Sequence, residues 1–210
     1  MGTQKIINHY TKYILKHNKR PSSVYNFCED LKIDESKFYD HFSSFDQLDS
    51  EILLRMVENA IALTLKDNEE NETKADAKHQ LLTFYLTLTE VFKSNRSLVT
   101  FLLPQGKMDL ASLKLLESTR KRFFEFINTL DVSLSFMSFL PDASVQEKTI
   151  QSAGWLHFIS ILKYWLQDNS SGFEKTDIFI EKSLKLSFEL SESNVLNSIV
   201  DLGKFMMNKK

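Results

Sequence analysis

An all-α fold is predicted for this chain of 210 residues by three features of its sequence. Apolar residues recur every three or four positions through most of the chain, which is the spacing of an amphipathic helix. No segment alternates apolar and polar residues as a half-buried strand does. The chain contains only three prolines and five glycines, and Pro21, Pro104 and Pro141 each fall at a predicted helix boundary.

The N-terminal part of the chain predicts a helix-turn-helix. Its first short helix carries apolar residues at i, i+3, i+4 and i+7, namely Val24, Phe27, Cys28 and Leu31. Ser22 or Ser23 can cap the start of this helix. After a tight turn, Asp34 is placed to cap a second helix whose buried side carries Phe38 and Phe42. Units of this kind present their second helix to the major groove of DNA.

Two further helices complete the N-terminal region. A helix before residue 20 places Ile6, Ile7, Tyr10, Ile14 and Leu15 on one face, which can cover the two short helices. Ser44 and Gln47 have the spacing of a capping box, which opens a long helix over about 46–67. We therefore expect a three-helix head in residues 1–48, joined by that long helix to a larger helical bundle in residues 68–210.

The bundle is expected to be a series of helices. The acidic and polar run 67–76 is the clearest loop in the sequence. Helices are expected after it at about 74–94, 96–103, 108–130, 144–168, 174–191 and 193–207. Ser144 and Glu147 form a second capping-box pattern, which predicts the start of the fourth of these helices.

The distribution of charge sets limits on function. The formal net charge is −2, so no basic field covers the whole chain and general adhesion to nucleic acid is not expected. Residues 1–20 contain five basic residues and no acidic residue, whereas residues 21–50 contain seven acidic and two basic residues. Any binding to DNA therefore has to be local.

The rest of the composition excludes several classes of protein. The single cysteine, Cys28, rules out an internal disulfide and is expected in the core. With no signal peptide and no apolar run of about 18 residues, we expect a cytoplasmic protein without membrane contact. The five histidines are scattered, the acids are expected on solvated helix faces, and no metal, phosphate-loop or nucleophile motif occurs. We therefore expect no enzymatic activity, no metal and no cofactor.

Several residues of the head carry a resemblance to a known family. Ser23-Val24, Cys28-Glu29, Ile33 and the run Phe38-Tyr39-Asp40-His41-Phe42 together resemble the N-terminal signature of TetR-family transcriptional regulators. The resemblance covers residues 3–60, while the rest of the chain agrees in layout only. It implies DNA contacts from the helix-turn-helix, which we expect at Ser23, Tyr25, Ser36, Lys37, Tyr39 and His41.

Two positions depart from the family pattern. Lys32 stands in the turn where family members usually carry glycine, so Lys32 or a neighbour has to adopt a left-handed backbone or the turn is remodelled. Phe45 stands where a basic residue is common and would meet a phosphate, so that contact is lost. Because Lys37 is the one firm cation of the second helix, we expect each head to bind double-stranded DNA weakly and in a salt-sensitive way. Two heads on one dimer bind DNA more tightly than a single head, because binding of the first head raises the effective concentration of the second.

The aromatic residues of the bundle allow two interpretations. One is ordinary core and dimer packing, since rings at helical spacing usually lie in a core. The other, implied by the TetR resemblance, is a cavity between helices for an apolar small-molecule ligand. The rings expected to line it are Phe84, Phe92, Phe101, Phe123, Phe126, Trp155 and Phe158.

The last long helices are expected to form a homodimer. In the resembling family, two helices of each chain pair with their twofold mates in a four-helix seam. Here the seam is expected to contain Ala153, Gly154, His157, Ile161, Phe179, Leu184 and Phe188. The segment 193–207 predicts an extra amphipathic helix that caps the bundle or strengthens the seam, with a membrane-surface role as the alternative.

Two functions remain open from the sequence. The first is a dimeric TetR-like transcriptional regulator controlled by an apolar ligand, favoured by the Tyr39-x-His41-Phe42 element and the basic first helix. The second is a TetR-fold protein that no longer binds DNA and acts as a lipid or hydrophobe binder or as a protein-interaction module. The acidic second helix and Phe45 favour this alternative.

Overall fold

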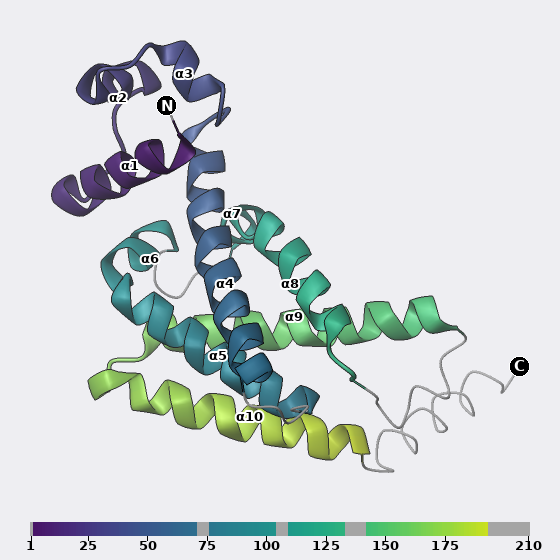
Figure 1. The fold of residues 1–210 in the computed structure, drawn as a ribbon. Helices are drawn as coiled ribbons and strands as arrows, with labels where there is room; N and C mark the ends of the chain where they lie inside the picture. The colour runs from purple at the N-terminus through teal and green to yellow at the C-terminus, as the bar shows by residue number, and fades with distance from the viewer. Residues whose placement is uncertain (1, 71–75, 104–108, 133–141, 193–210) are drawn as a thin grey trace, which may run out of the picture. The chain divides into compact units, whose positions relative to one another are not determined.

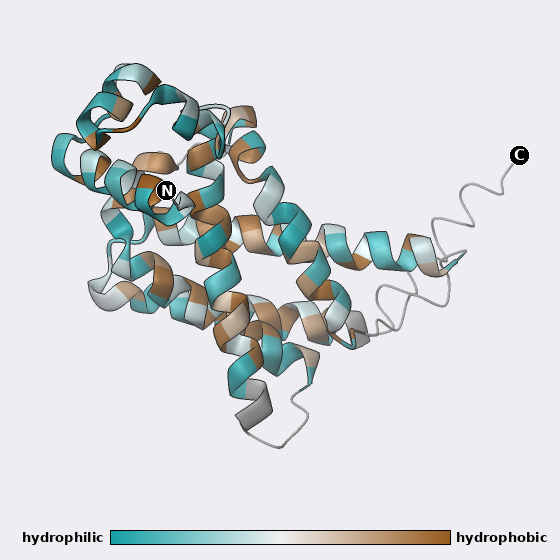
Figure 2. Cartoon of the chain, turned by 45° about the horizontal axis from the view of Figure 1, so that its top comes forward, coloured by the Kyte–Doolittle hydropathy of each residue, from teal (hydrophilic) through white to brown (hydrophobic). Residues whose placement is uncertain are grey.

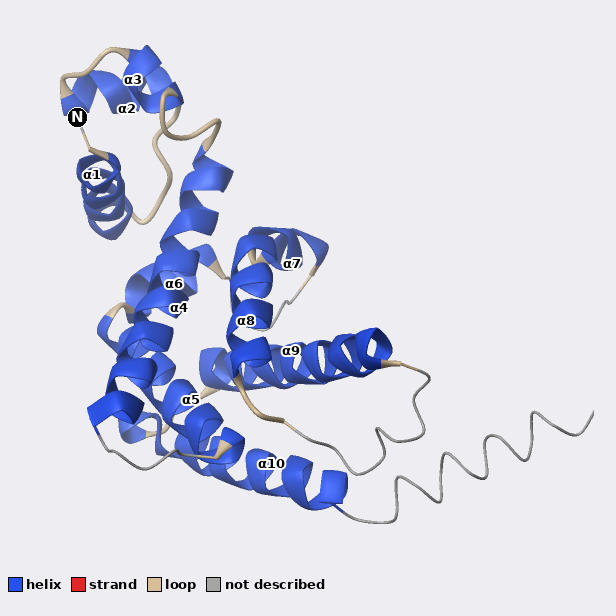
Figure 3. Cartoon of the chain, turned by 45° about the vertical axis from the view of Figure 1, so that its right-hand side comes forward, coloured by secondary structure: helices blue, strands red, loops and turns tan. Residues whose placement is uncertain are grey.

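The computed structural model describes residues 2–70, 76–103, 109–132 and 142–192 (Figure 1). Within these ranges all regular secondary structure is helical, and Figure 3 shows no strand among them. The predicted all-α fold class is confirmed. The residues group into two compact units, one formed by Met1–Asn59 and Leu88–Arg122 and the other by Ala60–Thr87 and Phe123–Lys210. The division into a head at 1–48 and a body at 68–210 stays a prediction.

The first unit begins with the helix-turn-helix. α1 spans Thr3–His17, α2 spans Val24–Leu31, α3 spans Glu35–Tyr39 and α4 spans Phe45–Glu70. α1 packs against α2, and α2 packs against α3. Figure 2 shows that these helices each mix hydrophobic and hydrophilic residues, as expected of amphipathic helices around a small core.

Local signals in the sequence place the ends of these helices. The Ser23 hydroxyl accepts a hydrogen bond of 3.1 Å from a backbone N–H in the first turn of α2. Lys32 ends α2 in a left-handed backbone with φ of 57°, one of the outcomes predicted for this turn. The Ser44 hydroxyl accepts from Gln47 N at 3.2 Å, and the Gln47 side chain accepts from Ser43 N at 2.6 Å. The predicted capping box therefore forms with its second bond shifted by one residue.

Aromatic rings fill the core of the helix-turn-helix. The ring centroid of Phe27 lies 5.9 Å from that of Tyr10, 6.0 Å from that of Phe38 and 5.8 Å from that of Phe45. Phe45 also stacks on Tyr10 at 5.2 Å. Cys28 is buried, as predicted. Phe45 therefore contributes to packing between helices, which explains an aromatic residue at this position.

The next four helices are divided between the two units, because the first unit includes Leu88–Arg122 and the second includes Ala60–Thr87 and Phe123–Lys210. α5 spans Ala77–Ser94, α6 spans Arg96–Leu102, α7 spans Leu110–Leu115 and α8 spans Glu117–Thr129. α6 packs against α1. The single helix predicted over 108–130 is wrong, because the backbone leaves the helical path at Leu116, with φ of −89° and ψ of 8°.

The second unit contains the last two long helices that the structure describes. α9 spans Ala143–Gln167 and α10 spans Glu174–Glu192, and the two helices pack against each other. A short 3-10 turn, η2, joins them at Ser171–Phe173. Gly172 in this turn has a left-handed backbone with φ of 63°, which glycine adopts without strain.

Asp168 organises the connection between α9 and α10. Its carboxylate accepts hydrogen bonds of 2.7–2.9 Å from the backbone N–H and the hydroxyl of both Ser170 and Thr176. Burial by itself would raise the pKa of Asp168, but the hydrogen bonds from Ser170 and Thr176 outweigh it and lower the pKa to about 2. The carboxylate therefore stays ionised, and the turn is fixed by charge-assisted hydrogen bonds.

The predicted start of α9 is also corrected. Asp142 caps this helix, because its carboxylate accepts a backbone hydrogen bond of 3.0 Å from the first turn. Ser144 lies inside the helix, and Glu147 accepts a hydrogen bond of 2.6 Å from the Asn128 side chain of α8. The capping box predicted at Ser144 and Glu147 is wrong because an acid two positions earlier reaches the free N–H groups. The segment 193–207 lies outside the described residues.

Candidate functional site

The residues predicted to contact DNA lie on the surface of the helix-turn-helix. They come from the cap and first turn of α2, from α3 and from the turn after α3, and all six are exposed: Ser23, Tyr25, Ser36, Lys37, Tyr39 and His41. Phe38 of α3 is fully buried. The recognition helix is therefore held by its inner face and offers its outer face to solvent, while contact with DNA stays a prediction.

The single cation within α3 is engaged by an acid. Lys37 Nζ lies 3.1 Å from a carboxylate oxygen of Asp40, and both side chains are more than half exposed. An exposed pair of this kind contributes at most about 1 kcal/mol. Lys37 can therefore exchange Asp40 for a phosphate at a small cost, but the displaced carboxylate stays close to the phosphate.

Two exposed tyrosines also have acidic partners. Tyr25 donates its hydroxyl to Glu29 at 3.0 Å, and Tyr39 donates to Glu35 at 3.4 Å. The side chains are 56% and 52% exposed, which leaves both rings available to a partner. The hydrogen bond to Glu29 raises the pKa of Tyr25, and desolvation followed by the Glu35 charge raises the pKa of Tyr39. Both phenols therefore remain protonated donors, and both donate to a carboxylate in the free protein.

His41 and α1 connect the recognition surface to α4. His41 Nδ1 lies 3.1 Å from the Thr3 hydroxyl at the start of α1. In the same turn of α1, the Gln4 side chain accepts a hydrogen bond of 2.8 Å from Arg55 of α4. α1 therefore contacts both the end of the helix-turn-helix and the helix that follows it.

A partly buried ion pair joins the helix-turn-helix to the start of α4. Arg20 lies in the connection between α1 and α2, and its guanidinium binds the carboxylates of Asp46, at 2.8 Å, and of Asp49. Asp49 is fully buried, whereas the Asp46 side chain is 77% exposed. We call Arg20, Asp46 and Asp49 the Arg20 clasp. The expectation that the acids lie on solvated faces is wrong for Asp49, which is buried. Its negative charge is compensated by the positive charge of Arg20.

The clasp includes a buried charge that depends on its partner. Burial raises the pKa of Asp49 against the attraction of Arg20, and the Asp49 charge in turn raises the pKa of Arg20 against the effect of burial. Neither Asp49 Oδ1 nor the buried Tyr10 hydroxyl makes a hydrogen bond of normal geometry within the described structure. Burial and then the Asp49 charge raise the pKa of Tyr10, so the phenol stays protonated beside the carboxylate.

Five of the rings predicted to line a ligand cavity form one cluster in the second unit. Phe84 lies 5.0 Å from Phe126, and Phe158 lies 5.1 Å from Phe123 and 5.0 Å from Trp155, on which it stacks. These are the separations of rings in contact. The other two predicted rings, Phe92 and Phe101, belong to the first unit. The role of all seven rings in ligand binding stays a prediction.

Four residues predicted for the dimer seam are engaged within one chain. Ile161 and Leu184 are buried. His157 shares a hydrogen bond of 2.8 Å with the Ser183 hydroxyl of α10, and burial lowers the pKa of His157 to about 4. A Cβ added at Gly154 would lie 3.4 Å from the Ile127 side chain of α8, so this glycine permits close packing inside the unit.

The exposed apolar surface of α9 and α10 lies mainly at other residues. Ala153 is exposed, and Phe179 and Phe188 are partly exposed. Four larger side chains are between 41% and 68% exposed: Leu156, Ile178, Leu186 and Leu190. These side chains are available to a second copy of the chain, so the dimer seam stays a prediction with a different set of central residues.

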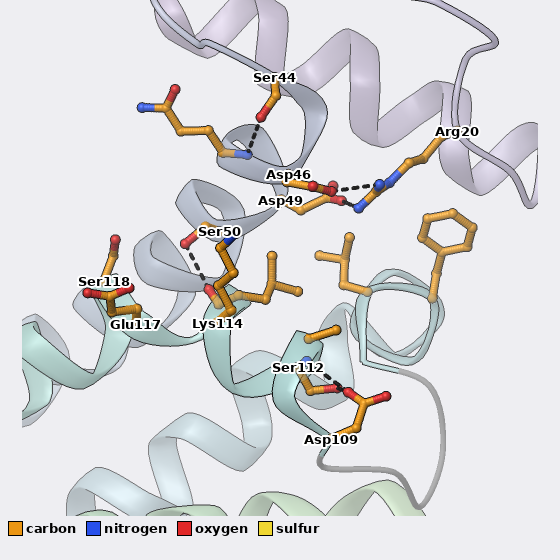
Figure 4. Close-up of a pocket in the computed structure, with 15 residues that line it drawn as sticks. Arg20, Ser44, Asp46, Asp49, Ser50, Asp109, Ser112, Lys114, Glu117 and Ser118 are labelled. Atoms are coloured by element: carbon orange, nitrogen blue, oxygen red, sulfur yellow. Dashed lines mark hydrogen bonds and ion pairs between the residues drawn. The ribbon is translucent and has the colours of Figure 1, made fainter.

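A cleft of about 830 Å³ opens within the first unit, and no sequence signal indicated it (Figure 4). The start of α4, with Arg20, lines one part, and residues of α6, α7 and the start of α8 line the rest. Ser50 of α4 donates its hydroxyl to the Leu115 carbonyl at 2.8 Å and joins these parts. The cleft contains both the Arg20 clasp and apolar side chains such as Phe101 and Leu102.

Comparison with known proteins decides the family. The protein-family model described as tetracyclin repressor-like, C-terminal domain, matches residues 80–206, which is more than half of the chain. The chain belongs to the TetR family of transcriptional regulators. Among solved structures, the chain is similar to a candidate transcriptional regulator from Streptomyces coelicolor A3(2), with 16% identity and a TM-score of 0.38 over 89% of this chain and 98% of that one. No curated protein matches it.

The TetR-family match concerns the C-terminal domain, so it adds to the signature recognised in the helix-turn-helix.

The Arg20 clasp was not predicted from the sequence. A signal was present, because Asp49 lies in the apolar stripe of α4 between Leu48 and Ile52, where an acid needs a cation. The position of Arg20 as its partner depends on the fold of the connection after α1.

Two further properties of this TetR-family protein concern metal binding and membranes. In the described parts of the chain, no group of three or more histidine, cysteine, aspartate or glutamate side chains is placed to hold a metal ion. Among the same residues, no helix is both long and apolar enough to cross a membrane.

Proposed function

We propose that this TetR-family protein is a DNA-binding transcriptional regulator that acts as a homodimer under the control of a small-molecule ligand. The observation that carries the proposal is the exposed outer face of α3, mounted on the aromatic core around Phe27. A short helix held by Phe38 and displaying Ser36, Lys37 and Tyr39 has the form needed in a major groove. The proposal places the protein in the cytoplasm and includes no catalytic step, cofactor or membrane contact.

The charge of the head predicts weak binding by each copy. Most of the affinity of such proteins for DNA comes from neutralised phosphates. Exposed lysines available for this role include four on α1 and just after it, namely Lys5, Lys12, Lys16 and Lys19. Asp34, Glu35 and Asp40 on the recognition surface oppose the approach of a phosphate. Two heads joined in a dimer compensate through effective concentration.

The pairing of the recognition side chains with acids favours a second candidate. Lys37, Tyr25 and Tyr39 each have a carboxylate partner in the free protein. A surface that satisfies its own donors gains less from phosphates, since each contact with DNA replaces an existing one. The second candidate is a TetR-fold protein that does not bind DNA and serves as a lipid or hydrophobe binder or as a protein-interaction module.

A titration of the full chain against labelled genomic fragments of its source organism at low salt tests the first candidate. We expect one or a few fragments to bind at least about tenfold more tightly than the rest, and the double change Lys37→Ala with Tyr39→Ala to remove this preference. Lys93→Ala is the matched control, because Lys93 forms an exposed i,i+3 ion pair of 2.9 Å with Glu90 outside the helix-turn-helix. Equal binding of all fragments by the unaltered chain would favour the second candidate.

A further inference from the structure

The cleft in the first unit has the size and lining of a small-molecule site. Its volume of about 830 Å³ lies in the usual range of such sites. Part of the lining is apolar, with Phe101, Leu102, Ala111 and Leu115, and part is polar, with the Arg20 clasp and several serines (Figure 4). A ligand that fits both parts needs an apolar body and a polar end.

The acids that line the cleft are all engaged. Asp46 and Asp49 bind Arg20. Glu117 pairs with a lysine of α8 at 3.2 Å, and Asp109 accepts a hydrogen bond of 2.9 Å from the Ser112 backbone at the start of α7. A cationic ligand would therefore have to compete with an existing partner at each of these carboxylates.

The cations of the cleft have capacity left. The Lys114 ammonium group makes no hydrogen bond and no ion pair with any residue that the structure describes, and Lys114 lines the cleft from α7. Arg20 has five N–H donors, and the clasp uses its two terminal nitrogens. The Arg20 side chain is 43% exposed. Uncommitted positive charge beside an apolar wall is the chemistry that holds a carboxylate.

We propose that this cleft binds a small ligand with a carboxylate and an apolar body, with the carboxylate on Lys114 and Arg20 and the body against Phe101, Leu102 and Leu115. The proposal adds a site and a ligand class to the ligand control in the proposed function. It differs from the cavity expected among seven aromatic rings, because Phe101 is the one ring of that set among the lining residues of the cleft, all of which belong to the first unit.

Binding of a carboxylate at this place acts on the Arg20 clasp. Asp46 is the exposed member of the clasp, so a ligand carboxylate can replace it on Arg20 without stranding a buried charge. Asp49 is fully buried and keeps its bond to Arg20. The ligand would therefore loosen the first turn of α4 from the connection between α1 and α2, which carries the helix-turn-helix.

Isothermal titration calorimetry on the full chain, without DNA, tests the proposal with three probes of equal shape: biphenyl carboxylate, biphenyl carboxamide and biphenyl amidinium. We expect the carboxylate to bind at least about tenfold more tightly than the neutral amide and the cationic amidinium. Lys114→Met should weaken carboxylate binding about tenfold. Asp46→Asn should tighten it several-fold, because the competitor of the ligand for Arg20 is removed.

Two controls and a second variant make the result specific. Lys12→Met removes an exposed lysine of α1, and Glu51→Gln removes an acid of α4 that pairs with Arg55, and neither residue lines the cleft. Both should leave the dissociation constant unchanged, and Lys114→Gln should reproduce Lys114→Met. Tightest binding of the amidinium, equal binding of the three probes, no binding, or weaker carboxylate binding by Asp46→Asn would each overturn the proposal. Because DNA is absent from this experiment, failure of DNA recognition by the helix-turn-helix leaves its result unaffected.

Discussion

At the scale of single residues, Asp49 is expected to have a large effect on stability. Its carboxylate is fully buried and is compensated by Arg20, which is itself only partly buried. Removal of one partner from a buried pair leaves an uncompensated charge, whereas replacement of both partners by apolar residues is often neutral. The Arg20 clasp is therefore expected to fix geometry more than to add stability.

The clasp predicts a characteristic pattern in a double-mutant cycle. Arg20→Met should lower the free energy of unfolding by about 3–5 kcal/mol, and Asp49→Leu in the same chain should restore most of that loss. Urea unfolding at neutral pH measures both. Arg55→Met serves as a control, because Arg55 and Glu51 form a partly exposed pair whose loss should cost about 1 kcal/mol or less. A double variant as unstable as the single variant would contradict this account of Asp49.

His157 predicts a pH dependence of stability. Burial lowers its pKa in the folded chain from 6.5 to about 4, so between these values the unfolded chain binds more protons than the folded chain. The contribution of His157 is therefore fully present above pH 6.5 and is lost as the pH falls towards about 4. His157→Gln should flatten the decline in this window by up to about 3 kcal/mol.

Urea unfolding at several pH values from 4 to 7 checks the His157 prediction. His79→Gln is the matched control, because His79 is an exposed histidine at the start of α5 and should leave the pH profile unchanged. An identical decline in the His157→Gln chain and in the unaltered chain would show that this side chain is not buried in its neutral form.

The residues that sequence reasoning placed correctly act locally. Ser23 caps the helix that follows it directly, and Lys32 ends the same helix. Arg20 and Asp49 are 29 positions apart, and their contact depends on where the connection after α1 places the guanidinium. A sequence pattern read over one helix cannot supply that position.

At the scale of elements, the turn between α2 and α3 predicts a stabilising substitution. Lys32 holds a left-handed backbone with φ of 57° at the end of α2, a conformation that costs a residue with a Cβ about 1 kcal/mol relative to glycine. Lys32→Gly should therefore raise the free energy of unfolding by about that amount. Lys37→Gly, inside α3, should lower it by a similar amount. Thermal or urea unfolding of the two variants checks the contrast, and a loss of stability in both would contradict it.

The exposed apolar residues of α9 and α10 predict the centre of a dimer seam. Leu156 and Leu186 are 68% and 56% exposed, which is unfavourable for a surface that remains in water. Leu156→Glu and Leu186→Glu should each weaken dimer formation at least about tenfold. Size-exclusion chromatography with light scattering over a range of concentrations measures the change. Leu15→Glu, on α1 with 54% exposure, should leave the dimer intact. If the unaltered chain were monomeric at all concentrations, the predicted dimer seam would be wrong.

Most helices could be predicted because their apolar spacing is a local property of the sequence. The starts of two helices could not be predicted in this way, because they depend on which of several neighbouring residues ends or caps the helix. Asp142 reaches the first turn of α9 before Ser144 can cap it, and the backbone at Leu116 separates α7 from α8 within one apolar run. The spacing of the aromatic residues indicated that rings would pack together. It did not indicate that Phe92 and Phe101 belong to the first unit.

At the scale of the whole molecule, the uneven charge of the N-terminal region governs the proposed function. The lysines of α1 attract phosphates, while the acids on and around α3 oppose them. Sequence-specific binding then requires that a few base contacts by Ser36, Lys37 or Tyr39 exceed this repulsion. Such contacts discriminate by about 1–3 kcal/mol each, which is enough when two heads act together.

The most direct measurement of the central claim is the affinity of the full chain for its preferred genomic fragment as a function of salt, beside a fragment of unrelated sequence. The account predicts a preference of at least about tenfold and a logarithm of the affinity that falls linearly with the logarithm of salt concentration, with a slope of about −3 or steeper between about 50 and 200 mM. Equal affinities for the two fragments, with a slope close to zero, would contradict it.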